Sequence, residues 1–332
     1  MKYISYFCHM NSLVTTVYSQ EDELPLLSNK VFFHSKALFQ IYAETPRIKP
    51  YMVVISTSEG KELCHLLASL RYHTSLFPPY LYTHCHILGE GEYQSEENRE
   101  KLFRLMLQTI TKKMSGKAFY IELSHLSTKM FAYKHLRATG FSPIKWMSIH
   151  NSLHSKMPIE RLSQKQIDKI KQAKSHGVIT KEVENTEELR QLVKLLQKHN
   201  LLKIKRYIPD KRFFELLFHS NQAKLYITQY KQKYIGCCVC VASRNNMYLW
   251  YMASLRKTYR HLHPDTLTVW YAIKQAHAEK YDHIYFMDVG LPYTRNPYRE
   301  FILRFGGKPV STLRWFRISI SWLNKLLRFF SY

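Results

Sequence analysis

The sequence is poor in acidic residues and in the residues that mark fibrous or disulfide-linked proteins. Its 332 residues include 25 Asp and Glu against 49 Lys and Arg, a formal net charge of +24. It has only 10 Gly and 12 Pro, which excludes collagen-like and low-complexity architecture. Its six cysteines are too sparse for a disulfide scaffold, and we expect reduced thiols in a cytoplasmic protein. The excess of positive charge favours anionic partners such as phosphates, nucleic acid or an acidic membrane surface.

The sequence also lacks any long apolar run. No stretch approaches the roughly 18 consecutive apolar residues of a membrane span, and the first nine residues lack the apolar core of a signal peptide. Hydrophobic residues make up 45% of the chain and charged residues 22%, which is typical of proteins that form a core. We therefore expect a soluble protein, cytoplasmic or peripheral on the inner membrane face, and the length favours two domains.

The two halves of the chain have the same order of predicted elements. Each has a hairpin, a third strand, a long helix, a further strand, a short helix, a Gly that ends this helix and a Pro that prevents its continuation. In the first half these are residues 50–57, 62–73, 80–88, 96–115, 119–123, 133–137, Gly140 and Pro143; in the second half they are 225–230, 234–243, 246–253, 265–280, 283–288, 300–304, Gly306 and Pro309. Helices predicted at 164–175, 186–199 and 210–218 open the second half. A chance likeness is the alternative, but the agreement in order and length favours a duplication, with domains at 1–155 and 156–332.

A set of short motifs, mostly in the second half, resembles a known fold. The motifs are Met252-Ala253-Ser254, Tyr259 to Pro264, Trp270 to Ile273, Asp288-Val289-Gly290 and Arg304 to Val310. With the order of elements, they resemble the GNAT acyltransferase fold. Two such units in tandem resemble the Fem family of peptidoglycan-bridge aminoacyltransferases and the related GNAT acetyltransferases of polysaccharide gene clusters. The resemblance implies an α+β fold of two tandem GNAT-like domains, each a mixed, mostly antiparallel sheet flanked by helices. It also implies a catalytic second domain and a first domain that is non-catalytic or binds the acceptor.

The resemblance implies acetyl-CoA or another acyl-CoA as donor, and the sequence departs from the family at the donor loop. Many GNAT enzymes hold the pyrophosphate of the donor on the backbone N–H groups of a glycine-bearing loop before the long helix. Here no Gly occurs between Gly236 and Gly290. The start of a helix still offers free N–H groups, and cationic side chains can add charge-assisted hydrogen bonds. The donor-binding candidates are Met252, Ala253, Ser254, Arg256, Lys257, Tyr259 and Arg260.

The catalytic candidates lie at the carboxyl ends of the two strands that are expected to be parallel, 246–253 and 283–288. In the resembled fold these strands splay apart, and the opening holds the acyl donor. Asp288 is the first candidate, as a base or as the group that orients the acceptor, and Tyr251 is the second. The alternative for Asp288 is a structural one, in which its carboxylate binds the N–H groups of the next loop. Glu122 is expected at the equivalent point of the first half.

Further candidates follow Gly290 and occur at cysteine and histidine clusters. Arg295, Tyr298 and Arg299 are expected on the acceptor side of the cleft, or else form an ordinary loop before a helix. The Cys237-Cys238-Val239-Cys240 segment contains one CxxC motif without the second pair that a zinc site needs, so we interpret these cysteines as small core residues. His84 and His86 share one face of a strand, but no carboxylate accompanies them at a fixed spacing. No metal is expected.

Three functions compete. The first is an acyltransferase that moves an acyl group from acyl-CoA to an amine or hydroxyl of a sugar, amino sugar or cell-envelope precursor. The second is a Fem-like transferase that uses aminoacyl-tRNA. It ranks lower because Gly177, Asn200 and Pro209 interrupt the helices of 159–222, where a Fem protein has a long helical arm. The third is a non-catalytic protein that binds nucleic acid or a membrane surface through a basic stripe, Arg161, Lys165, Lys169, Lys171 and Lys174.

The C-terminal segment is a candidate for contact with a further binding partner. No acidic residue follows Glu300, and the segment from about Ser321 is an amphipathic, basic helix. It is predicted either to pack on the core or to contact an anionic membrane, which would suit a lipid-linked saccharide acceptor.

Overall fold

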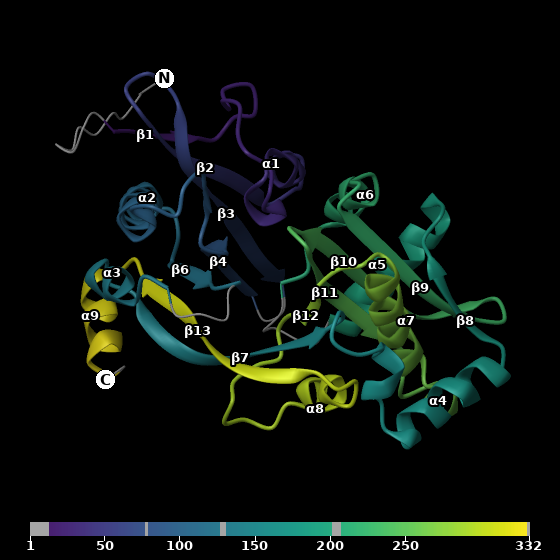
Figure 1. The fold of residues 1–332 in the computed structure, drawn as a ribbon. Coiled ribbons are helices and arrows are strands. Elements are labelled where there is room, and N and C mark those ends of the chain that lie inside the picture. The colour runs from purple at the N-terminus through teal and green to yellow at the C-terminus, as the bar shows by residue number, and fades with distance from the viewer. Residues whose placement is uncertain (1–12, 77–78, 127–130, 201–206, 331–332) are drawn as a thin grey trace. The chain divides into compact units, whose positions relative to one another are not determined.

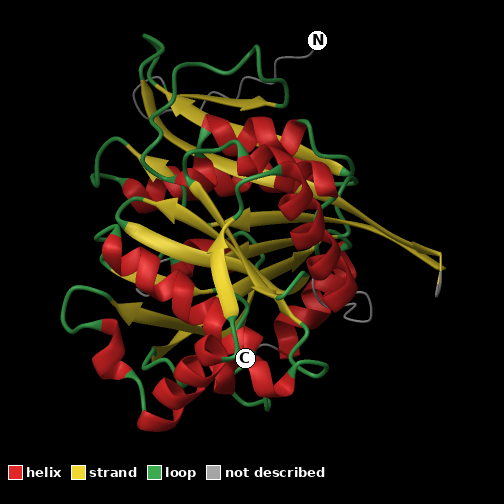
Figure 2. Cartoon of the chain, turned by 90° about the vertical axis from the view of Figure 1, so that its right-hand side faces the viewer, coloured by secondary structure: helices red, strands yellow, loops and turns green. Residues whose placement is uncertain are grey.

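The computed structural model describes residues 13–76, 79–126, 131–200 and 207–330. The first nine residues, which include Cys8, lie outside this range. The chain forms two compact units, labelled by element in Figure 1: unit 1 is Met1–Trp146 with Ser311–Tyr332, and unit 2 is Met147–Val310. Strands and helices occur together throughout (Figure 2), so the α+β class is confirmed. Across the described residues, no helix combines the length and apolar character needed to cross a membrane.

Unit 1 is one sheet with helices on it. Its elements are β1 (Val14–Tyr18), η1 (Phe32–His34), α1 (Lys36–Ala43), β2 (Ile48–Ser56), β3 (Glu62–Leu76), β4 (Pro79–Leu88), β5 (Glu92–Tyr93), α2 (Arg99–Met114), β6 (Tyr120–Ser124), α3 (Tyr133–Ala138), the end of β13 (Lys308–Ile318) and α9 (Ser321–Phe330). The strand order is β1-β2-β3-β4-β6-β13, and β4 and β6 are its parallel pair. The apolar residues of α2 recur at helical spacing and are buried in the unit-1 core.

Unit 2 repeats this plan. Its elements are the end of β7 (Ser142–Ser152), η2 (Pro158–Arg161), α4 (Gln164–Ser175), β8 (Val178–Glu182), α5 (Thr186–Asn200), α6 (Lys211–Phe218), β9 (Ala223–Tyr230), β10 (Lys233–Ser243), β11 (Asn246–Ser254), η3 (Arg260–Leu262), α7 (Pro264–Ala278), β12 (His283–Phe286) and α8 (Pro297–Leu303). The order is β7-β12-β11-β10-β9-β8, with β11 and β12 parallel. The core of unit 2 is packed under α7 and includes Cys238 and Cys240.

The compact units differ from a division at 155/156 because the last strand of each unit comes from the other half of the chain. Residues 314–318 of β13 pair antiparallel with β6, and residues 149–152 of β7 pair antiparallel with β12. Ser311–Tyr332 therefore belongs to unit 1, and residues 147–155 belong to unit 2. Each parallel pair thus gains an antiparallel neighbour, so that neither β6 nor β12 is left as an edge strand.

Candidate functional site

The two parallel strands of unit 2 separate at their carboxyl ends. They pair in register from Asn246↔His283 to Leu249↔Phe286, and the Met287 N–H donates to the Leu249 carbonyl at 3.3 Å. There β12 ends, two residues earlier than the sequence predicts, whereas β11 continues to Ser254 beside β10. The ladder between β11 and β12 ends at Leu249, and the five residues of β11 beyond it continue beside β10 alone among the paired strands.

A bulge in β11 lies at this point of separation. Val239 of β10 is opposite Tyr251 and Cys240 is opposite Leu249, so Trp250 is the extra residue. Because of the bulge, Trp250 and Tyr251 lie on the same face, with stacked rings whose centroids are 5.3 Å apart. Both rings also contact Phe213 of α6. Tyr251, a predicted catalytic residue, is thus buried in an aromatic cluster beneath α6.

The bulge also decides where the next predicted residues lie. Met252 belongs to the core on the α7 side of the sheet. Ala253 and Ser254 are buried and remain paired with β10. All three predicted donor-binding residues of this strand therefore lie along the part of β11 that β12 leaves uncovered.

Asp288 is two residues past the end of β12 and is half-buried. Its backbone has φ +61°, a left-handed conformation that few residues other than Gly adopt, although Asp tolerates it better than most. Such outliers cost free energy and cluster at functional sites. The sequence pattern of a strand through Asp288 does not show this turn.

The loop after Asp288 is held by Asn296 and Arg299. The Asn296 amide donates to the Val289 carbonyl at 3.0 Å, and its oxygen accepts the N–H groups of Tyr298 and Arg299 at the start of α8. The Arg299 guanidinium donates to the carbonyls of Val289, Leu291 and Thr294. Arg299 therefore positions this loop.

The other two predicted acceptor-side residues have other contacts. Arg295 is exposed and lies 3.5 Å from Glu300, and Tyr298 packs against the unit-2 core. Sequence reasoning missed Asn296, although an Asn before a Pro is a recognisable helix-start signal.

The loop between β11 and α7 is basic. Arg256, Lys257 and Arg260 are exposed, and no carboxylate of the described residues forms an ion pair with any of them. Tyr259 packs against the unit-2 core and anchors the loop. The following helix α7 begins at Pro264, and its N-cap residue, His263, has φ +43° and makes no side-chain cap. The N-terminus of α7 is therefore an electropositive end.

Further cations surround the start of α7. The His263 ring Nε2 is 3.2 Å from the Gln172 side-chain oxygen of α4. Burial lowers the pKa of Lys169 on α4, and Arg304 and Lys165 lower it further; burial and then Lys169 lower the pKa of His263. An anionic ligand would relieve this crowding of positive charge.

Unit 1 has a different residue at the position that corresponds to Asp288. Gly140 and Gly306 both have positive φ and precede a Pro by three residues. Counted from these glycines, Arg314 of β13 corresponds to Ser148 of β7. Arg314 pairs with Ser124, and Ser148 precedes Ile149, which pairs with Phe286. Ser124 therefore corresponds to Met287, and His125 to Asp288.

The expectation for Glu122 was wrong by three residues. Glu122 instead lies 3.0 Å from the Arg314 guanidinium. Gly140 is 15 residues after His125, whereas Gly306 is 18 residues after Asp288, so an equal offset counted along the sequence selects Glu122 and not the residue at the matching place in the sheet.

His125 closes the end of the unit-1 parallel pair. Its Nδ1 is 3.0 Å from a carboxylate oxygen of Glu90, which follows β4, and its Nε2 accepts the indole N–H of Trp315 at 3.0 Å. The Trp315 donor fixes the tautomer, because Nε2 must then be unprotonated and Nδ1–H donates to Glu90. Both ring nitrogens of His125 thus have protein partners, and the side chains of His125 and Glu90 are buried.

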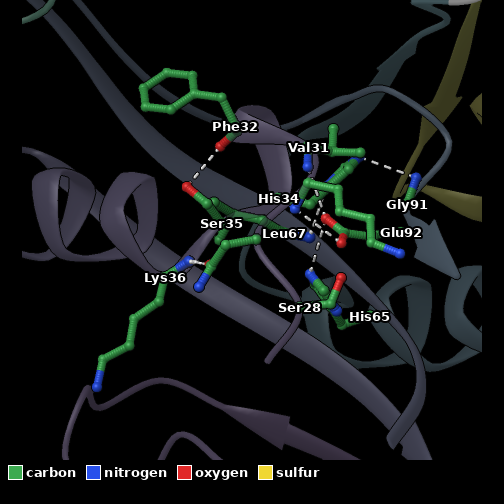
Figure 3. Close-up of polar contacts among 12 residues, drawn as sticks. Ser28, Val31, Phe32, His34, Ser35, Lys36, His65, Leu67, Gly91 and Glu92 are labelled. Carbon is green, nitrogen blue, oxygen red and sulfur yellow. Dashed lines mark hydrogen bonds and ion pairs between the residues drawn. The ribbon is translucent and has the colours of Figure 1, made fainter. Parts of the chain in front are cut away.

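The loop after β4 is acidic where the unit-2 loop is basic. Figure 3 shows this loop with His34 and Glu92: the His34 ring nitrogens lie 3.1 Å from the Leu67 amide and 2.9 Å from the Gly91 amide, and Glu92 accepts the Val31 N–H at 2.8 Å. Gly89 is needed here, because a Cβ would lie 2.9 Å from His34 Nε2. The glycines of this loop accommodate protein side chains, and its carboxylates disfavour phosphate.

Comparisons with known proteins identify the same fold. Residues 164–295, which lie within unit 2, match the family described as Acetyltransferase (GNAT) domain. The solved structure of FemX is 11% identical, with a TM-score of 0.60, over 85% of this chain and 90% of that one. A tandem GNAT protein from the clavulanic acid biosynthesis pathway is 9% identical, with a TM-score of 0.56, over 90% and 91%. The C-terminal domain of a putative lysylphosphatidylglycerol synthetase from Agrobacterium fabrum is 9% identical, with a TM-score of 0.57, over 90% and 95%.

No curated protein matches the chain. At these identities the solved structures show the fold alone. The chain has a tandem GNAT fold that resembles Fem-like transferases, and the GNAT domain match supports a transferase.

Proposed function

We propose that the protein is an acyltransferase that moves an acyl group from acyl-CoA, with acetyl-CoA as the simplest donor, to an amine or hydroxyl of a sugar, amino sugar or cell-envelope precursor. One observation carries the proposal: β11 continues past the end of β12, the half-buried Asp288 follows β12, and the loop after β11 carries three exposed cations without a carboxylate partner among the described residues. This arrangement offers backbone groups for an acyl chain, positive charge for phosphates and a carboxylate for the acceptor. We expect the reaction in the cytoplasm.

In the proposed reaction the acceptor nitrogen or oxygen attacks the thioester carbonyl, and the bond from the carbonyl carbon to sulfur breaks. Coenzyme A leaves as a thiolate and takes up the proton that the acceptor has lost. Asp288 orients the acceptor and takes its proton. Backbone N–H groups of β11 beyond the end of β12 stabilise the oxyanion. Arg256, Lys257, Arg260 and the N-terminus of α7 hold the phosphates, while Met252 to Ser254 line the donor. Tyr251 supports the bulge from beneath, and Arg295, Tyr298 and Arg299 shape the acceptor side.

We assign a non-catalytic or acceptor-binding role to unit 1. Its counterpart of Asp288 is His125, both of whose ring nitrogens have protein partners. Its loop after β4 carries Glu90 and Glu92, which repel a phosphate-bearing donor. Contact of the C-terminal helix with an anionic membrane would suit a lipid-linked saccharide acceptor.

An aminoacyl-tRNA donor is the second candidate. The likeness to FemX and the net charge of +24 favour it. It ranks below acyl-CoA because a Fem protein has a long helical arm in this region. Here the helices α4, α5 and α6 are at most 15 residues long, and all three lie within unit 2.

Titration calorimetry with acetyl-CoA at two salt concentrations tests the donor. We expect saturable binding that Arg256→Ala and Arg260→Ala each weaken roughly tenfold, since each removes a charged contact to phosphate. Arg190→Ala on α5 is the matched control, because this arginine is exposed and pairs only with neighbouring Glu187 among the described residues. Absence of binding at both salts would reject acyl-CoA. Filter binding to charged and uncharged tRNA would then test the second candidate, and failure of both would favour a non-catalytic protein.

Asp288→Asn tests the chemistry separately. Release of coenzyme A is followed with a panel of amino sugars and sugars as acceptors. We expect turnover to fall roughly 100-fold or more, in the range for loss of a general base, with acetyl-CoA binding unchanged. Asp168→Asn, at an exposed aspartate of α4, is the control. Full turnover by Asp288→Asn would remove Asp288 from the mechanism and leave the donor assignment standing.

A further inference from the structure

The helix α9 in unit 1 exposes apolar side chains and buries a polar one. Asn324 is only 8% exposed, whereas Trp322 is 69% and Leu326 is 48% exposed. Trp322 and Leu326 are four residues apart and therefore lie on one face of the helix. A helix that packs on a core has the opposite arrangement. The side chains of residues 327–330, which the sequence analysis also assigned to this helix, lie outside the described set.

Polar contacts hold α9 in this orientation. The Asn324 side chain accepts the Ile318 N–H at 2.9 Å and donates to the Gly140 carbonyl at 2.9 Å. Nearby, the Arg317 side chain donates to the Thr139 carbonyl at 3.1 Å. These bonds attach α9 beside the end of α3 (Figure 1), and they do not require Trp322 or Leu326 to be buried. The apolar face is thus fixed outward.

Two more exposed apolar side chains lie at the start of α9. The Ser319 N–H donates to the Phe119 carbonyl at 2.9 Å, so Phe119 and Ile320 come together at the end of the β6–β13 pair. Phe119 is 45% and Ile320 is 40% exposed. We name Phe119, Ile320, Trp322 and Leu326 the α9 surface. It combines two segments that are far apart in the sequence.

Two exposed lysines lie close along the sequence to members of the α9 surface. Lys325 is exposed on α9, Lys117 is exposed two residues before Phe119, and no acidic residue occurs from Phe301 to the end of the chain. Exposed apolar residues with an interfacial Trp and flanking lysines complement the surface of an anionic bilayer, where apolar groups enter the acyl boundary and lysines contact headgroups.

We propose that the α9 surface docks unit 1 on an anionic membrane. The docking is peripheral and reversible, and it is independent of the donor and of the reaction in unit 2. Trp322 and Leu326 enter the interface, and Lys325 and Lys117 contact the headgroups.

Co-sedimentation of the full chain with vesicles tests the docking. Vesicles of equal phosphatidylglycerol and phosphatidylcholine should bind the protein, and vesicles of phosphatidylcholine alone should bind it weakly. Trp322→Ser and Leu326→Ser should each weaken binding roughly tenfold, as expected for loss of a buried apolar side chain. Ile179→Ser in unit 2 is the matched control, since Ile179 is 63% exposed and distant in sequence. Lys325→Glu should weaken binding roughly fivefold or more, and Lys194→Glu on α5 should not.

Fluorescence gives a second, independent measurement. Trp322 is the most exposed of the five tryptophans, so its emission should shift to shorter wavelength on vesicle binding. Trp322→Phe should bind vesicles and lose this shift. Equal binding by wild type and Trp322→Ser, or no binding to phosphatidylglycerol vesicles, would overturn the proposal. So would a concentration-dependent dimer, seen by sedimentation velocity and lost in Trp322→Ser, because a second copy would then cover the surface. Circular dichroism checks the fold, and Phe119→Ser tests the surface from a second segment.

Discussion

His73 and His84 form a hydrogen-bonded pair in unit 1, in which His84 is buried and His73 is half-buried. His73 Nε2 and His84 Nδ1 are 2.5 Å apart across β3 and β4, and Arg71 lies beside them. Burial, together with Arg71, lowers the pKa of His73 to about 4 and the pKa of His84 to about 2. Among the described residues no group of three or more His, Cys, Asp or Glu is placed to hold a metal. His84 and His86, which the sequence places on one face of a strand, both lie in β4.

The low pKa of His84 predicts loss of stability in mild acid. An unfolded histidine has a pKa of about 6.5. Below that pH the unfolded chain binds a proton that folded His84 does not, so stability is complete above about pH 6.5 and falls as pH decreases toward 2, by up to about 1.4 kcal/mol per pH unit. Urea unfolding between pH 7 and 4.5 should show this slope, and His84→Gln should reduce it by about one proton. His219→Gln, at an exposed histidine, is the control variant. An unchanged slope in His84→Gln would contradict the assignment.

At the scale of elements, a series of hydrogen bonds between buried hydroxyl groups connects the start of α7 to the strands β9 and β8. Thr268 donates to the Pro264 carbonyl at 2.7 Å, and Thr228 of β9 lies 2.6 Å from Thr268 and 2.8 Å from Thr180 of β8. Since Thr268 uses its proton on the carbonyl, Thr228 donates to Thr268 and Thr180 donates to Thr228. Gly236 permits this approach, because a Cβ there would lie 2.7 Å from the Thr268 hydroxyl.

Thr228→Val should destabilise the protein by about 1–3 kcal/mol, since Thr180 then loses its acceptor and Thr268 its donor in a buried place. Thr228→Ser keeps the hydroxyl and should recover most of this loss. Urea denaturation of the two variants and of the wild type is the measurement. Equal stability of the Ser and Val variants would mean that the hydroxyl chain contributes nothing.

Local patterns predicted most elements but not the details of the site. Strands 50–57, 62–73 and 246–253 and helix 164–175 agree with β2, β3, β11 and α4 to within a few residues, because alternation, helical spacing and Gly or Pro signals are local. The bulge at Trp250 and the turn at Asp288 escaped prediction. A bulge exists only in relation to its partner strand, and a left-handed Asp in a strand-like pattern has no composition signal. The hydrogen bonds of His125 to Glu90 and Trp315 also escaped prediction, because they join segments that are far apart in the sequence.

At the scale of the whole molecule, the two compact units share one plan, and their bounds differ from the halves of the sequence. Both units have antiparallel strands, one parallel pair and a final antiparallel strand. That final strand comes from the other half of the chain in each case. Pairing between strands so distant in sequence leaves no local signal, which is why a cut at 155/156 looks natural in the sequence and divides β7 from its partner β12.

Two fragments test this exchange of strands. Residues 147–310 contain all of unit 2, including the β7 segment that pairs with β12, and we expect this fragment to unfold cooperatively on heating. Residues 156–332 lack that segment and carry residues 311–332 without β6, so β12 is left as an unpaired edge and Trp315 loses its place in the unit-1 core. We expect the second fragment to aggregate or to melt without a cooperative transition, because an unpaired strand edge and an exposed apolar segment both promote association. Calorimetry and sedimentation velocity on the two purified fragments decide the matter. Cooperative, monomeric unfolding of 156–332 with aggregation of 147–310 would restore the division at 155/156.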